Sequence, residues 1–241
     1  MRTILPVSAL LCVMAAIVLV EHTPNSLAAQ GASGARGKTA DEYAATLPKD
    51  VYPDSGSRLP LIKREDLNDE DKKVYDIVNA DTRSLVGLRG PGGIRLYSPR
   101  LTEYTRKGSQ YLRYDSGLGP RLSELAILVT AREFDQQFEW AAHEPAGLKA
   151  GLEPAIIDIV KHRKPVTGIG EKEAAIIQVG REAIGKRKVS SDTFARALKL
   201  FGKEVLVNMV SLMGQYAGTA ILLNTFDQQL PPGQKPPLPM P

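Results

Sequence analysis

The sequence predicts an all-α protein, and three observations support this. Apolar residues recur at helical spacing through most of residues 61–230, and several of these runs start with a capping residue or a first-turn proline. Residues 122–131 are apolar except for Ser123, Glu124 and Thr130, which is typical of a helix buried on nearly every side. No stretch alternates apolar and polar residues as a half-buried β-strand does.

Residues 1–29 have the organisation of a secretory signal peptide. Arg2 gives a charged start, an apolar run ends at Val20, and small residues near Ala28 suit cleavage. We therefore expect export to the periplasm or the medium, with no membrane attachment after cleavage. An uncleaved anchor stays open as an alternative, although the run is short for a bilayer. A lipoprotein is disfavoured, because no small residue directly precedes Cys12.

Cysteine content and charge exclude several classes of function. Cys12 is the only cysteine and lies in the predicted signal, so the processed chain would have no thiol. Disulfides, thiolate nucleophiles and cysteine metal sites are thereby excluded. The formal net charge of +4 is mild, and no basic run is interleaved with aromatic residues. We therefore expect no nucleic-acid partner.

The chain between the signal and the helical domain predicts an irregular arm. Residues 30–50 are rich in Gly, Ala, Ser and Thr, and residues 51–60 add prolines and an Asp-Ser-Gly turn sequence. Residues 30–60 are thus expected to be flexible or extended. The sequence leaves open whether this arm lies on a neighbouring subunit.

The first predicted helix spans residues 69–79. Asn68 can cap it through its side-chain oxygen, and acidic residues follow in the first turn, where the helix dipole favours them. Val74, Ile77 and Val78 are expected to form its inward stripe.

Residues 90–93 read Gly-Pro-Gly-Gly and predict a sharp turn that places Arg95 and Tyr97 near the mouth of a pocket. A phosphate-binding loop is disfavoured, because no strand precedes it and the Lys-Ser/Thr ending is missing. Ser98 and Pro99 predict the start of a helix running to about residue 114. Its apolar side is expected at Leu101, Tyr104, Gly108, Tyr111 and Leu112.

The remaining helices follow from similar signals. Pro120 lies in the first turn of the apolar helix, a further helix is expected at residues 136–149, and Gly202 is expected to interrupt the last long helix. The other predicted segments are residues 154–162, 170–185, 192–200 with Ser191 as cap, and 204–226. Residues 231–241 are rich in proline and predict either a linker-like end or an arm packed on a surface.

Candidate chemistry lies on the helix at residues 136–149. Gln136, Glu139 and His143 are three and four residues apart and share one face, so the Glu139 carboxylate is expected beside the His143 ring. A carboxylate there would orient the imidazole and make the pair a candidate proton donor. Pro145 is expected to loosen the helix near His143, with Phe138 and Trp140 as apolar bulk around the same turn.

Other interpretations of these residues stay open. A Glu and a His four apart often form a solvated surface pair. A metal site has one further histidine to draw on outside the predicted signal, His162, so we expect no metal. No G-x-S-x-G sequence supports a Ser-His-Asp triad. Arg121 and Arg132 can bind a substrate carboxylate or pair with surface acids, and Tyr216 and Asn224 can line a pocket or belong to the core.

The sequences RLSELAIL and AREFDQQFEWAAHEP resemble the carboxymuconolactone decarboxylase-like family, whose fold is shared with the alkylhydroperoxidase D proteins. The similarity covers residues 97–152 clearly, including LYSPRL and YLRYDSGLGPRLSELAILVTAR, and extends more loosely to Phe226. In the redox branch of that family, a glutamate precedes a Cys-x-x-Cys pair and a histidine. Glu124 and His143 match the glutamate and histidine, while Gln136 and Glu139 occupy the cysteine positions.

This resemblance implies an alkylhydroperoxidase D-like helical domain of the non-redox branch. Without thiols a disulfide cycle is excluded. The branch implies cofactor-free decarboxylation or isomerisation of a small lactone or organic acid, in subunits assembled as homotrimers or homohexamers.

We therefore expect a lyase or isomerase in which His143 protonates carbon, Glu139 orients it and Glu124 completes the proton network. Substrate binding is expected at Arg132, Gln136, Trp140 and Tyr97. A non-catalytic ligand-binding or assembly protein on the same fold, and a thiol-independent oxidoreductase, are the alternatives.

Overall fold

The computed structural model describes residues 40–240, so the predicted signal peptide and the first part of the arm lie outside the described residues. Every regular element in the described range is helical, and the one β-type contact there is an isolated bridge between Tyr52 and Ser57. The predicted all-α class is confirmed. The elements are α1 (Ala40–Ala44), η2 (Arg64–Asp66), α2 (Asp69–Asn79), α3 (Pro91–Arg95), α4 (Pro99–Gln110), η3 (Tyr111–Asp115), α5 (Pro120–Glu133), α6 (Gln137–Lys149), α7 (Pro154–Lys161), α8 (Glu171–Gly180), η4 (Arg181–Gly185) and α9 (Ser191–Thr225).

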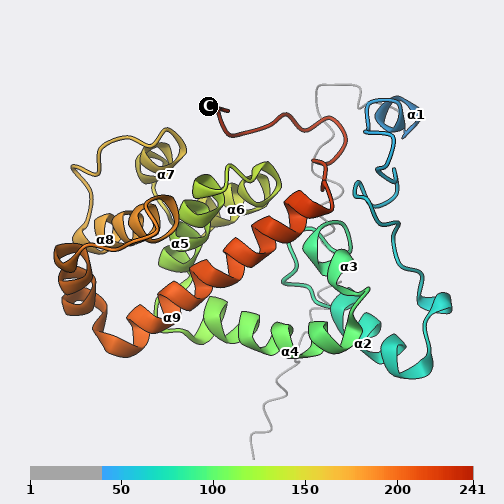
Figure 1. The fold of residues 1–241 in the computed structure, drawn as a ribbon, viewed down its shortest axis with the longest axis horizontal. Helices are drawn as coiled ribbons and strands as arrows, with labels where there is room; N and C mark the ends of the chain where they lie inside the picture. The colour runs from blue at the N-terminus through green and yellow to red at the C-terminus, as the bar shows by residue number, and fades with distance from the viewer. Residues whose placement is uncertain (1–39, 241) are drawn as a thin grey trace, which may run out of the picture. The chain divides into compact units, whose positions relative to one another are not determined.

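Helix α5 is the centre of the helical domain. It contacts α6, α7, α8 and α9, and these helices surround it in Figure 1. Every residue from Ser123 to Arg132 is buried, as the apolar sequence predicts. Gly119 has φ +75°, a conformation that glycine adopts readily, and Pro120 then starts the helix. The charged residues Glu124 and Arg132 are among the buried residues of this helix.

Helix α9 crosses the domain beside α5 and α8 (Figure 1). Its backbone leaves helical geometry at Gly202, with φ 72° and ψ 174°, where the sequence predicts a break. The side chain that caps its start is Ser190 rather than the expected Ser191: Ser190 Oγ accepts from the backbone N–H of Thr193 at 3.3 Å. By length and composition α9 could cross a membrane, but the same features suit a core helix, and Met209 and Leu212 are fully buried.

Helix α2 begins where the sequence predicts, but the side that it turns toward the domain is not the predicted one. Asn68 Oδ1 accepts from the backbone N–H groups of Glu70 and Asp71 at 3.0 and 2.9 Å. The predicted inward stripe is wrong at Ile77, whose side chain is 51% exposed. The reason is that α2 packs mainly against α4, so one narrow strip of the helix is covered.

Helix α4 also departs from its prediction. Its regular part ends at Gln110, and a wider π-type turn, η3, continues to Asp115. The expected inward side is wrong, because Leu101 and Tyr104 are 55% and 68% exposed. Thr102 is instead the buried residue of α4, since the helix packs on α2 and α3 through that side. Ser98 precedes the helix as expected, but its side chain makes no capping hydrogen bond.

The glycine-rich turn forms a short helix, α3, rather than a simple loop. Gly90 has φ +98°, and a Cβ on Gly93 would lie 1.9 Å from the Leu88 carbonyl oxygen. A larger residue at position 93 therefore cannot be accommodated. This close approach fixes the end of α3, from which Arg95 extends.

Helix α6 starts at Gln137, with Gln136 as its N-cap residue and the Gln136 Oε1 accepting from the Phe138 N–H at 2.9 Å. The helix continues through Pro145 to Lys149, so the expected loosening does not end it.

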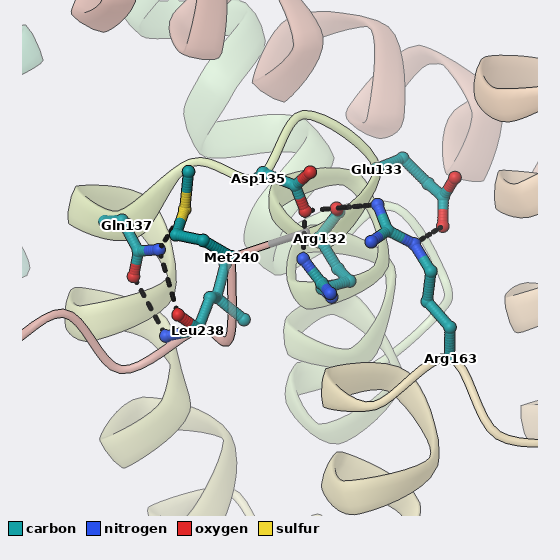
Figure 2. Close-up of polar contacts among 7 residues, drawn as sticks. All are labelled: Arg132, Glu133, Asp135, Gln137, Arg163, Leu238 and Met240. Carbon is teal, nitrogen blue, oxygen red and sulfur yellow. Dashed lines mark hydrogen bonds and ion pairs between the residues drawn. The ribbon is translucent and has the colours of Figure 1, made fainter.

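The C-terminal tail is packed against the domain, which is the second of the two predicted outcomes. Leu238 is buried to 3% exposure in the main core. As Figure 2 shows, the Gln137 side chain forms two hydrogen bonds with the Leu238 backbone. It accepts from the Leu238 N–H at 2.9 Å and donates to the Leu238 carbonyl at 3.1 Å. The described part of the N-terminal arm, residues 40–60, also packs on its own chain. At Gly56 its carbonyl accepts a hydrogen bond from the Gln229 N–H at 2.7 Å.

Leu238→Ala is expected to lower the free energy of unfolding by about 2–5 kcal/mol, because it removes a buried side chain and leaves a cavity. Met240→Ala is the matched control, since Met240 is 67% exposed and should change stability by less than about 0.5 kcal/mol. Chemical denaturation of the parent and both variants measures this. Equal, small losses in both variants would show that the tail does not contribute to the core.

Candidate functional site

A pocket of about 140 Å³ lies beside α6 and is bounded by α3, α4, η3, α9 and the segment before α3. Polar side chains from α3, α4, η3, α6 and α9 reach it. The lining residues that carry charge or a titratable group are Arg95, Arg113, Glu139, His143 and Tyr216. The site is therefore built from helices that are far apart in the sequence.

His143 is held in one orientation by Glu124. The His143 Nδ1 and the Glu124 Oε2 are 2.7 Å apart, and both side chains are buried. Arg113 donates to the other Glu124 oxygen at 3.4 Å. Tyr216 packs edge-on against the imidazole, with ring centroids 5.1 Å apart. A carboxylate on Nδ1 leaves Nε2 as the imidazole atom free for chemistry.

The expectation that Glu139 orients His143 is wrong. Although they share a helix face, α5 packs on α6 so that Glu124 reaches the imidazole first. Both Glu139 carboxyl oxygens are buried and have no hydrogen-bond partner within residues 40–240.

The pKa values of two carboxyl groups at this site, Glu124 and Glu139, are shifted in opposite directions. Burial acts to raise the pKa of Glu124, but the His143 hydrogen bond and the charges of His143 and Arg113 outweigh it and hold that pKa below its ordinary value. Burial raises the pKa of Glu139 to about 8, only partly offset by the charge of Arg95. At neutral pH Glu139 is thus a protonated acid, while Glu124 is an anion. Separation of two carboxyl pKa values in this way is a feature of acid–base sites.

Arg95 supplies a cation without an anionic partner. It donates to the Thr219 hydroxyl at 2.6 Å, and it forms no ion pair with any carboxylate in residues 40–240. Burial lowers the pKa of its guanidinium, although an arginine stays charged at neutral pH. A partly buried guanidinium with spare donors is suited to binding a carboxylate or an oxyanion.

The expected substrate-binding residues lie elsewhere. Arg132 pairs with Asp135 at the end of α5, in the charged cluster with Arg163 and Glu133 shown in Figure 2. Gln136 caps α6 and donates to Asn224 at 2.6 Å. These contacts are structural, because they hold the end of α5 and the start of α6 in place.

Trp140 and Tyr97 are also outside the pocket. Trp140 is fully buried in the core, and its indole N–H donates to Glu144 at 2.8 Å. The Tyr97 hydroxyl donates to the Pro60 carbonyl at 2.9 Å and ties the arm to the domain. Arg121 pairs with Glu153 and Glu173, which is the surface-pair alternative.

The structure therefore brings Glu124, Glu139 and His143 together, as the sequence predicts, and adds Arg113 and Arg95. Arg113 lies in η3, where the sequence carries no signal beyond its charge. Arg95 was expected near a pocket mouth and does line the pocket. Tyr216 lines it as well, whereas Asn224 bonds Gln136. Within residues 40–240, no group of three or more His, Cys, Asp or Glu side chains is arranged to hold a metal ion.

Comparison with known proteins adds no identification: no protein-family model matches the chain, and no curated protein matches it significantly. Residues 40–240 form an all-α domain with a pocket that holds a carboxyl group, an imidazole and two guanidinium groups.

Proposed function

We propose that this protein is a cofactor-free lyase or isomerase that transfers protons on a small carboxylic acid or lactone. The observation that carries the proposal is the unpaired Glu139 carboxyl, with its pKa near 8, in the same pocket as a His143 held by Glu124. A protonated acid and an oriented imidazole in one pocket are the two groups that proton transfer at carbon needs.

In this proposal Arg95 binds the substrate oxygen on which negative charge grows, either of a carboxylate or of a lactone carbonyl. In a lyase reaction the bond to the leaving carbon dioxide breaks, and its electron pair enters an enolate. Glu139 then gives its proton to carbon, and His143 passes a proton from water to restore the Glu139 acid. In an isomerase reaction His143 removes a proton from one carbon, and Glu139 gives a proton to another.

Placement in the carboxymuconolactone decarboxylase-like family, with an alkylhydroperoxidase D-like fold, is part of the proposal. It is supported by the 2.7 Å contact between Glu124 and His143, the two positions that match the family's glutamate and histidine. Export and assembly as a homotrimer or homohexamer belong to the same proposal.

His143→Ala is expected to lower turnover by about 10²–10⁴-fold, the usual contribution of an acid–base group. Small lactones and hydroxy acids that raise the melting temperature of the parent would first be selected. Each would then be incubated in D2O, and deuterium incorporation at carbon followed by NMR. Arg95→Gln should raise the KM for the same compound. Deuterium incorporation at the parental rate in His143→Ala would contradict the proposed mechanism.

A further inference from the structure

A second and larger cavity adjoins the acid–base pocket. It has a volume of about 500 Å³ and runs as an open groove between α4 and α9. Seven residues line both spaces, among them Arg95, Arg113 and Gln215, so the small pocket opens into the groove. Ligand sites for drug-sized molecules have volumes of about 300–1,000 Å³, and the groove falls in this range.

Helix α9 forms the floor of the groove, and two glycines without side chains leave open space above it. Gly214 and Gly218 are four residues apart and lie on one face of the helix. A Cβ added at either would meet no atom within 4 Å. Glycine inside a helix costs about 1 kcal/mol relative to alanine, and no neighbour in residues 40–240 requires it here. The open space is therefore available to a ligand.

The walls of the groove are largely apolar, and its charges are mostly neutralised. Val78, Leu101 and Leu222 supply aliphatic surface. On the outer side Arg83 and Arg106 both pair with Asp81, at 3.4 and 2.9 Å.

On the inner side Arg113 pairs with Glu124. Of the four arginines that line the groove, Arg95 is the one without an ion pair in residues 40–240. It lies where the groove meets the pocket that holds Glu139 and His143.

We propose that pocket and groove form one binding site for an amphipathic carboxylic acid, with its carboxylate at Arg95 and its apolar chain along Gly214 and Gly218. The inference rests on the proposed function and defines its substrate class. The reacting carbons next to the carboxylate would lie in the small pocket, and the substrate would be larger than that pocket alone can hold.

The test is calorimetric titration of the full chain with the straight-chain acids butyrate, hexanoate, octanoate and decanoate. Each acid in this series is two methylenes longer than the one before. Affinity is expected to rise along the series until the groove is filled, by up to roughly fourfold for each added methylene. Gly218→Leu should remove most of this gain and bring decanoate close to butyrate. Gly108→Leu is the matched control, because Gly108 also lies in a helix with open space around it but outside both cavities, and it should leave the chain-length series intact.

The outcomes separate the two proposals. If Arg95→Gln abolishes butyrate binding, the result supports binding of the carboxylate at Arg95. If the parent does not bind butyrate, or Arg95→Gln binds it as well as the parent does, the result counts against the proposed function. Equal affinity for butyrate and decanoate in the parent would overturn the groove inference alone. The groove inference would also be overturned if decanoate does not bind and sedimentation shows that Gly218→Leu dissociates an assembly. A second copy of the chain would then cover the groove.

Discussion

Glu139→Gln is expected to stabilise the protein at neutral pH while removing most of its activity. The pKa of Glu139 is raised from 4.5 to about 8, so the folded state keeps a proton that the unfolded state loses above pH 4.5. Stability due to this group is therefore complete below pH 4.5 and falls by roughly 1.4 kcal/mol per pH unit up to about pH 8. Glutamine has the same shape and no proton to lose, so the variant escapes this decline.

Urea denaturation of parent and Glu139→Gln at pH 4, 6, 7 and 8 measures the effect. The stability difference should grow in favour of the variant from about pH 4.5 to about pH 8 and then stay constant. Turnover of any substrate should fall by about 10²–10⁴-fold, because glutamine cannot give up a proton. A stability difference that does not change with pH would show that Glu139 is an ordinary ionised carboxylate.

Glu124→Ala is expected to have the largest destabilising effect, about 3–5 kcal/mol. Both Glu124 and His143 are buried, and the change leaves His143 and the guanidinium of Arg113 without their carboxylate. Since the pKa of Glu124 is lowered on folding, its contribution is present above its unfolded pKa and is lost as the pH falls through its folded pKa. The parent should therefore lose this stability in acid, and the variant should show less of that loss.

Glu153→Ala is the matched control for this prediction. Glu153 also pairs with an arginine, Arg121, but more than half of its side chain is exposed. Its removal should cost far less stability than Glu124→Ala, because exposed pairs contribute little. Denaturation of both variants at pH 7 compares them. A loss in Glu124→Ala as small as that in Glu153→Ala would mean that the buried contact with His143 does not hold the site together.

The sequence predicts those features that depend on one helix at a time. The burial of α5, the Asn68 cap and the break at Gly202 are local properties, and all three are present. The inward side of α4 was not predictable, because it depends on which helices pack against it. Leu101 and Tyr104 look like core residues at helical spacing, yet they are exposed, and Leu101 lines the groove.

The same distinction applies to the site. Spacing along α6 places Glu139 and His143 on one face, but which carboxylate bonds the imidazole is decided by the approach of α5. Arg95 and Tyr216 come from α3 and α9, so their meeting with His143 depends on the packing of several helices. Arg132 is a plausible anion ligand by charge alone, but its position at the end of α5 directs it to Asp135.

Direct titration of Glu139 tests the central claim, that a protonated acid lies beside the oriented His143. The protein would be labelled with ¹³C at the glutamate carboxyl carbons, and the Glu139 resonance assigned by its absence in Glu139→Gln. We expect a single titration of this resonance, with a pKa of about 8. A Glu139 resonance that titrates near 4.5, the ordinary value for glutamate, would contradict it.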